Sequence, residues 1–197
     1  MFNTWERKVK RSINAVTIVR FSNIDAHSEN LRKVKKGDVI YVPVGTVHGV
    51  GAGTLIAEIQ ESSNVTYRVY DYNRKDKNGK TRELHFDKAL EVMDLSSSKE
   101  VKQQARMVRY YPGSSREILC RCKYFITEKL TIKTGCSFSI YENSFQVLLC
   151  LDGDGQIEIA DKPGKSLRFR KGECMFLPAG LGRCFVLGDT TLLKIRC

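Results

Sequence analysis

The 197-residue chain has no long apolar run, and its N-terminus has no apolar segment of the kind found in signal peptides. A membrane helix needs about 20 consecutive apolar residues, so no membrane span is expected and a cytoplasmic location is predicted. Histidine is scarce, with 3 residues, and none follows His85. A nucleophilic cysteine later in the chain would therefore have no subsequent histidine to activate it.

Paired CxxC spacing, typical of zinc modules, is also absent, although the chain has 7 cysteines. All of them lie between residues 120 and 197, and several stand in strand-forming runs such as 147–151 and 174–177. Their number is odd, and the sequence shows no feature of an exported protein. We therefore expect reduced, buried thiols that pack as small apolar side chains.

Acidic residues are fewer than basic ones, 22 against 33, which gives a formal net charge of +11. Such a charge favours anionic partners. However, the basic residues are interspersed with acidic ones, and the chain has neither a long basic run nor a recognisable nucleic-acid motif. Nucleic acid is therefore not expected as a partner, since that function would rest on net charge alone.

Short alternating or apolar runs bounded by glycine dominate the chain and predict a mainly β protein. Early examples are residues 38–42, 54–59 and 65–70, and many more follow residue 118. One helix is expected to begin near Asp87, followed by a polar linker.

An internal repeat is the most informative pattern. Residues 37–48 align without a gap on residues 172–183, at a constant offset of 135. Each copy has Lys-Gly followed by an acidic residue, then four strand residues and Pro-x-Gly. The same turn, strand and corner are expected twice, as in a duplicated β unit. The copies end differently, with His48 in the first and Arg183 in the second.

The corner before His48 resembles the second characteristic motif of cupins, which are small antiparallel jelly-roll barrels. In that motif the histidine points inward as a metal ligand. The following residues resemble type I phosphomannose isomerases of the short bacterial form. The matching blocks are 49–72, 74–76, Gly79, 82–85, 151–155, 171–173 and 177–180.

This resemblance implies an enzyme that interconverts mannose 6-phosphate and fructose 6-phosphate through a cis-enediol. It also implies zinc, bound by a glutamine, two histidines and a glutamate. His48 is similar to the later histidine ligand, Arg68 to the active-site arginine, and Glu58 to an acidic residue of the same pocket. Arg68 would stabilise the enediolate or the phosphate. Two alternatives stay open: Glu58 as an orienting carboxylate or a paired strand residue, and Arg68 as an ion-pair partner of Asp71 or Asp76.

The other zinc ligands of the family come from a Gln-x-His-Pro segment and a later glutamate, and neither is present before Gly37. His27 and His85 are interpreted as structural. Residues 16–21 are β-prone and would either cover a sheet edge or be poorly ordered. We therefore interpret the chain as the C-terminal portion of such an enzyme, with little or no activity alone.

The expected architecture is mainly β, with two cupin-like jelly-roll units joined by a short helix and a linker. The first unit, residues 1–95, would be incomplete and carry the residual site. Residues 96–117 would form the linker, and 118–197 a complete, metal-free cupin. Expected partners are a phosphorylated hexose and a companion chain supplying the missing segment. The alternative function is a catalytically silent cupin that binds a sugar phosphate or a protein.

Overall fold

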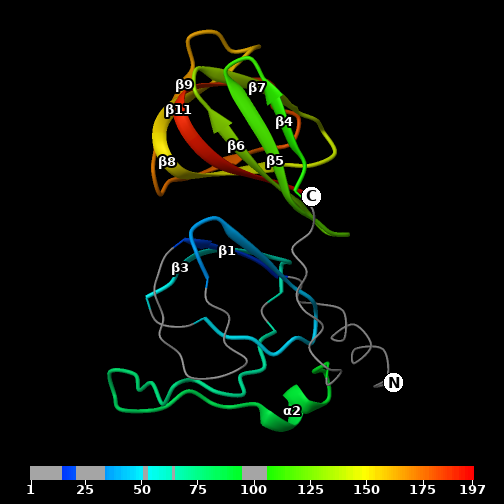
Figure 1. Ribbon diagram of the computed structural model, residues 1–197, viewed down its shortest axis with the longest axis vertical. Helices are drawn as coiled ribbons and strands as arrows, with labels where there is room; N and C mark the ends of the chain where they lie inside the picture. The colour runs from blue at the N-terminus through cyan, green and yellow to red at the C-terminus, as the bar shows by residue number, and fades with distance from the viewer. Residues whose placement is uncertain (1–14, 21–33, 51–52, 64, 95–105) are drawn as a thin grey trace. The chain divides into compact units, whose positions relative to one another are not determined.

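The protein is described from a computed structural model, shown in Figure 1. The described residues are 15–20, 34–50, 53–63, 65–94 and 106–197, with only the backbone described for 15–20. The chain divides into two compact units, Met1–Gln103 and Gln104–Cys197, and each is described separately. No helix among these residues is long and apolar enough to cross a membrane. The mainly β fold class is confirmed.

The first unit contains a three-stranded antiparallel sheet with strand order β2-β1-β3. Its strands are β1 (Ala15–Arg20), β2 (Asp38–Val42) and β3 (Leu55–Gln60). The β-prone segment 16–21 was expected either to cover a sheet edge or to be poorly ordered. Strand β1 instead pairs with both β2 and β3 and is the central strand of this sheet. A central strand pairs along both edges, so β1 holds β2 and β3 together.

The predicted strand at residues 65–70 is wrong, because this segment forms no ladder. Its backbone is paired locally with His85 instead: the Arg68 N–H donates to His85 Nδ1 at 3.2 Å, and the His85 N–H donates to the Arg68 carbonyl at 2.7 Å. These bonds occupy backbone groups that a strand partner would need.

The helix expected near Asp87 is α2 (Phe86–Leu90), which is short. After it, the Asp94 N–H donates to the Gly45 carbonyl at 2.9 Å. This bond joins the chain after α2 to the corner that follows β2.

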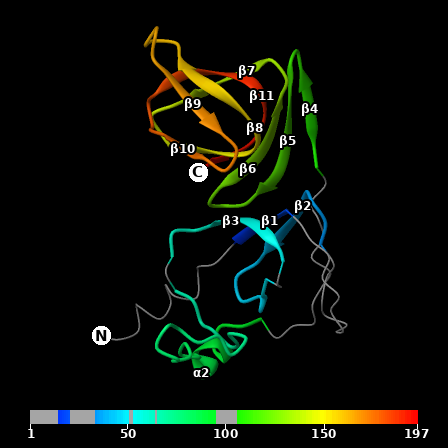
Figure 2. The ribbon, with the colours of Figure 1, turned by 90° about the vertical axis from the view of Figure 1, so that its left-hand side faces the viewer.

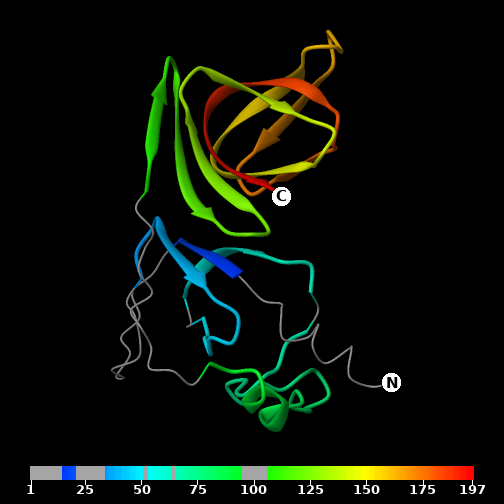
Figure 3. The ribbon, with the colours of Figure 1, turned by 90° about the vertical axis from the view of Figure 1, so that its right-hand side faces the viewer.

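The second unit is built from eight strands in one hydrogen-bonded network. They are β4 (Val108–Tyr111), β5 (Ser114–Arg121), β6 (Ile126–Ile132), β7 (Gly135–Ile140), β8 (Gln146–Ile159), β9 (Ser166–Arg170), β10 (Cys174–Leu177) and β11 (Gly182–Arg196). The longest strands, β8 and β11, pair along most of their lengths. β10 and β6 flank one end of this pair, whereas β9 and β7 flank the other. Two long strands shared in this way curl the network into the barrel seen in Figures 2 and 3.

The interior of this barrel is a dense apolar core. Its members include Leu130, Leu148, Cys150, Val186 and Leu192, each at most 1% exposed. Cys120 and Cys184 are also buried, and burial raises the pKa of the Cys120 thiol to about 11. All seven cysteines are free thiols, although Cys174 and Cys197 are exposed.

The expected linker, residues 96–117, requires correction in its later part. Strand β4 and the first residues of β5 lie inside that range and form an antiparallel hairpin. Gly113, with φ of 73°, provides the left-handed residue in the turn between them. Residues 96–105 lie outside the described residues.

The sequence repeat is also a structural repeat. Gly37 and Gly172 have φ of 91° and 90°, and Gly45 and Gly180 have φ of 84° and 72°. Both copies close the first turn with the same two bonds. Asp38 Oδ2 accepts from the Lys35 N–H at 3.1 Å, and Glu173 Oε2 from the Arg170 N–H at 3.0 Å; the N–H of each acidic residue in turn donates to the carbonyl of the same partner.

The repeat extends beyond this turn to the sheet around it. The order β2-β1-β3 in the first unit matches β10-β8-β11 in the second, and all these neighbours are antiparallel. When β2 is aligned on β10, β1 aligns on the first part of β8 and β3 on the last part of β11. A jelly roll in the first unit remains a prediction.

Candidate functional site

His48 follows the corner of the first repeat, where Pro43 ends the ladder of β2. Its side chain is exposed, and its Nδ1 lies 2.9 Å from the Thr46 carbonyl oxygen. A carbonyl can only accept, so Nδ1 carries the proton in this bond and Nε2 keeps a free lone pair. Histidine ligands of metals are usually oriented by such a bond.

Glu58 is exposed on β3 and lies opposite Thr17 of β1. Its counterpart in the structural repeat is Lys194 of β11, which lies opposite Leu148 of β8. Lys194 shares a sheet face with the core residue Leu192, because alternate strand residues point the same way. The position of Glu58 in the first unit is therefore equivalent to a position that faces the barrel interior in the second unit.

Lys194 itself is 4% exposed and is held by Glu128, whose Oε2 lies 3.1 Å from the lysine Nζ. Burial is the main cause that lowers the pKa of Lys194, and Glu128 partly counteracts it. At these equivalent sheet positions, the second unit has the buried ion pair of Lys194 with Glu128, and the first unit has the exposed carboxylate of Glu58.

Arg68 lies in the irregular segment after β3, and its side chain is 25% exposed. Its Nε lies 3.7 Å from Asp71 Oδ1, so the expected ion pair with Asp71 is present. In the described part of the chain, no hydrogen bond or ion pair joins the side chains of His48, Glu58 and Arg68. The expectation that they line the same pocket stays a prediction.

His85 fits its structural interpretation. Its Nδ1 accepts the Arg68 N–H, which places the ring proton on Nε2, 3.8 Å from Glu83 Oε2. The ring therefore links the Arg68 segment to the chain just before α2. His27 lies outside the described residues.

Asp71 is surrounded by three arginines, of which the sequence analysis assigned only Arg68. It is 6% exposed, and the Arg74 guanidinium donates to its Oδ1. Arg82 Nε lies 3.6 Å from its Oδ2, and Arg68 approaches Oδ1 as described. The hydrogen bond from Arg74 is the main cause that holds the pKa of Asp71 below its ordinary value, and the charges of Arg74, Arg82 and Arg68 lower it further.

Tyr72 connects this group to the His48 segment. Tyr72 and Asn73 have φ of 54° and 52°, a conformation that is uncommon outside glycine. The turn places Tyr72 so that a methyl group added to Gly49 would lie 3.0 Å from its hydroxyl oxygen. The Tyr72 side chain therefore reaches from the turn after Asp71 to the residue that follows His48. The sequence placed these residues in the matching blocks 49–72, 74–76 and 82–85, but the blocks did not indicate that the side chains lie together in space.

The described residues do not by themselves form a zinc site. Tight sites use three or four protein ligands, and no group of three His, Cys, Asp or Glu side chains is arranged to hold a metal within the described ranges. The orientation of His48 suits one ligand of such a site.

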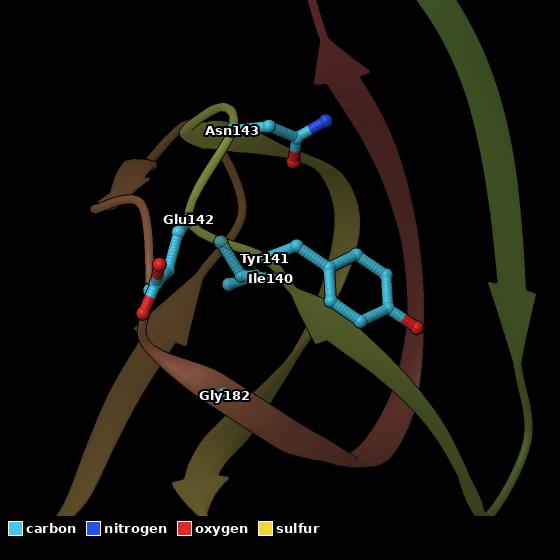
Figure 4. Close-up of a pocket in the computed structure, with 6 residues that line it drawn as sticks. Ile140, Tyr141, Glu142, Asn143 and Gly182 are labelled. Carbon is cyan, nitrogen blue, oxygen red and sulfur yellow. The ribbon is translucent and has the colours of Figure 1, made fainter.

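A shallow hollow in the second unit is lined by Ile140, Tyr141, Glu142, Asn143, Gly180 and Gly182. Figure 4 shows the Tyr141 ring and the Glu142 carboxylate pointing to different sides of it. Their polar groups do not converge, so this hollow has no feature of a specific binding site.

Comparison with known proteins places both units in one family. The family profile described as "Mannose-6-phosphate isomerase, cupin domain" matches residues 116–196. The Bacillus subtilis mannose-6-phosphate isomerase ManA is 37% identical over 150 residues, which cover 76% of this chain and 46% of ManA. The putative mannose-6-phosphate isomerase YvyI of the same organism is 34% identical over 161 residues, covering 82% of this chain and 49% of YvyI.

A crystal structure of the mannose 6-phosphate isomerase from Bacillus subtilis matches with a TM-score of 0.74 and 32% identity. The match covers 83% of this chain and 50% of that chain. The chain thus spans about half the length of the relatives it matches. With the glycine-bounded strands and the cupin-like sheet, these matches make the chain a member of the type I phosphomannose isomerase family of cupins.

Proposed function

We propose that the chain takes part in the interconversion of mannose 6-phosphate and fructose 6-phosphate. The observation that carries this proposal is the 37% identity with ManA over 76% of this chain. The local geometry supports it, because the hydroxyl of Tyr72, the residue after Asp71, lies beside Gly49, directly after His48. The reaction moves a proton between two adjacent carbons of a phosphorylated sugar.

Within this proposal each residue has one role. His48 would hold a zinc ion through Nε2, and that ion would polarise the sugar oxygens. Arg68 provides a permanent positive charge for the enediolate or the phosphate. Glu58 lines the same pocket from β3. The remaining ligands come from a companion segment, since among the residues of this chain only His48 matches the family's ligand set.

The proposal is tested with a coupled assay of mannose 6-phosphate isomerisation at saturating zinc. The purified 197-residue chain is measured alone and with a second polypeptide, the remainder of Bacillus subtilis ManA. We expect little or no turnover alone, because losing a single orienting group already costs about 10 to 100-fold in metal affinity or activity. We expect turnover when the two polypeptides are combined.

The controls are two neighbouring substitutions. His48→Ala should abolish the restored turnover, whereas Val47→Ala, at an exposed neighbour, should leave it within about twofold. No turnover in the combined sample would contradict the proposed function, and equal turnover in His48→Ala would contradict the role of His48. Turnover by the chain alone that disappears in His48→Ala would show that this chain holds further ligands.

A further inference from the structure

Strand β4 forms one edge of the second unit (Figure 2), and in the described part of the chain it pairs only with β5. All four of its residues are exposed, among them Val108 at 39%, Tyr110 at 82% and Tyr111 at 46%. An edge strand presents unpaired backbone groups that can pair with another strand, and proteins usually protect such edges with charges, proline or a covering segment. This edge instead carries large apolar and aromatic side chains, with Arg109 as the one charged residue of β4.

The hydrogen-bonding pattern of the β4–β5 hairpin shows which backbone groups of β4 point away from β5. The Ile118 N–H donates to the Met107 carbonyl at 3.2 Å, so these two residues form a hydrogen-bonded pair. Hydrogen-bonded and non-hydrogen-bonded pairs alternate along an antiparallel ladder, so the next residue of β4 that bonds to β5 is Arg109. The N–H and C=O groups of Val108 and Tyr110 therefore point outward, where an added strand would pair.

Arg109 has no counter-charge on its own face of the sheet. It lies directly opposite Arg116 of β5, and like charges in this position destabilise a strand pair. Within the described ranges, Arg109 has no hydrogen bond or ion pair. Arg116 Nη2 donates to the Ser137 carbonyl at 2.6 Å, its guanidinium lies 5.5 Å from the centre of the Tyr111 ring, and its Nε is buried without a hydrogen-bond partner. The two guanidinium groups leave a positive charge beside the edge that these contacts do not neutralise.

The one acidic residue of β5 does not supply the missing counter-charge. Glu117 follows Arg116 directly, and consecutive residues of a strand point to opposite faces of the sheet. Its carboxylate is therefore on the face opposite to Arg109. It is also already paired, with Arg106 Nη1 at 3.2 Å and with the Lys129 ammonium group. The arginine pair is thus suited to a carboxylate from outside the hairpin.

The charges do not favour a second copy of this chain at the edge. Two β4 strands, aligned antiparallel so that Val108 of each copy faces Tyr110 of the other, would place the two copies of Arg109 directly opposite each other. Like charges at such a position are destabilising. A strand with a carboxylate at this position would be attracted instead, so charge complementarity selects an acidic segment over self-pairing.

We propose that the edge of β4 binds an extended segment of a partner protein, which adds to the sheet through the backbone of Val108 and Tyr110. The segment has a carboxylate side chain opposite Arg109 and an apolar residue on each side of it in its sequence. Those apolar residues lie on the other face, against the side chains of Val108 and Tyr110. Main-chain hydrogen bonds supply the affinity, and the carboxylate supplies the specificity. This binding is independent of the proposed isomerisation, since it uses other residues in the second unit.

The experiment titrates the 197-residue chain with two synthetic peptides and follows its backbone amide shifts by nuclear magnetic resonance. One peptide alternates valine with glutamate, and the other alternates valine with lysine. We expect the glutamate peptide to shift the amides of residues 107–111 and to bind at least about tenfold more tightly, because glutamate meets Arg109 with a charge-assisted bond and lysine meets it with repulsion. Equal affinities, or no shifts at 107–111, would overturn the proposal.

A charge substitution tests the role of Arg109. In Arg109→Glu the introduced carboxylate lies opposite Arg116 and pairs with it, so the preference for the glutamate peptide should disappear. Arg121→Glu makes the same change of charge at an exposed residue at the end of β5, and it should keep the preference. A preference that survives in Arg109→Glu, or that is lost equally in both variants, would contradict the assignment of the carboxylate to Arg109.

The backbone pairing is tested at Val108. Proline has no N–H, so Val108→Pro removes an outward-pointing donor without removing a bond to β5. Binding of the glutamate peptide should weaken by about fivefold, the effect of one hydrogen bond, whereas Val108→Ala should change it by less than about twofold. Equal affinities in the two variants would contradict strand addition. Circular dichroism verifies folding, and the Arg109→Glu comparison decides if Val108→Pro does not fold.

The oligomeric state of the free chain distinguishes the remaining occupant. We expect a monomer in analytical ultracentrifugation. A dimer that Val108→Pro converts to monomers would show that a second copy occupies the edge and would overturn the proposal.

Discussion

The two units share one sheet arrangement but differ in what surrounds it. In the second unit, β10-β8-β11 is extended by β6, β5 and β4, and the barrel encloses a continuous apolar core. In the described part of the first unit, the buried apolar side chains are Val39, Val42 and Ala89, and a charged residue, Asp71, is buried among arginines. The repeat thus lies in a continuous apolar core in the second unit, whereas the described part of the first unit has few buried apolar side chains and a buried, ion-paired carboxylate.

The largest expected effect compares equivalent sheet positions in the two units. Leu192 is 0% exposed in the barrel core, so Leu192→Ala should destabilise the second unit by about 4 kcal/mol. Ile56, its counterpart on β3, is half-buried, and Ile56→Ala should cost about 1 kcal/mol. Urea unfolding followed by amide hydrogen exchange measures both. Equal costs would contradict the difference in packing.

A smaller effect compares the corner glycines. A methyl group at Gly45 would lie 2.9 Å from the Val92 carbonyl oxygen, whereas at Gly180 the nearest atom is Glu142 Cγ at 3.5 Å. Both have positive φ, so each Gly→Ala change carries about 1 kcal/mol of backbone strain. Gly45→Ala should cost about 1 kcal/mol more. Thermal unfolding of the two variants tests the ranking, and a larger loss in Gly180→Ala would reverse it.

The smallest effect is a pH dependence confined to the first unit. Because the pKa of Asp71 is lowered in the folded chain from its ordinary value of 3.8, its ionised form stabilises the fold. That contribution is complete above pH 3.8 and is lost as the pH falls through the lowered pKa. Asp71→Asn should therefore flatten the acid unfolding of residues 65–94, measured by hydrogen exchange between pH 5 and about pH 2. An unchanged acid profile would contradict the ion pairing.

The sequence was sufficient for features that depend on local pattern. The glycine-bounded runs predicted β2 and β3 and, without bounds, further strands after residue 118. The repeat located its turns, because positive φ and proline act within a few residues. The irregular segment after β3 was not predictable in this way. There, the bonds between Arg68 and His85 replace a ladder, and the arginines reach Asp71 from both sides in sequence. Such contacts depend on how loops pack, which periodicity does not encode.

The most direct test of the account maps where mannose 6-phosphate binds on the 197-residue chain by nuclear magnetic resonance. Backbone amide shifts are followed during titration, with inorganic phosphate as a second ligand. The account predicts shifts in the first unit, at residues 45–50 and 68–85, and none along the strands of the barrel, 126–196. Shifts centred on the barrel, with residues 68–85 unaffected, would contradict it.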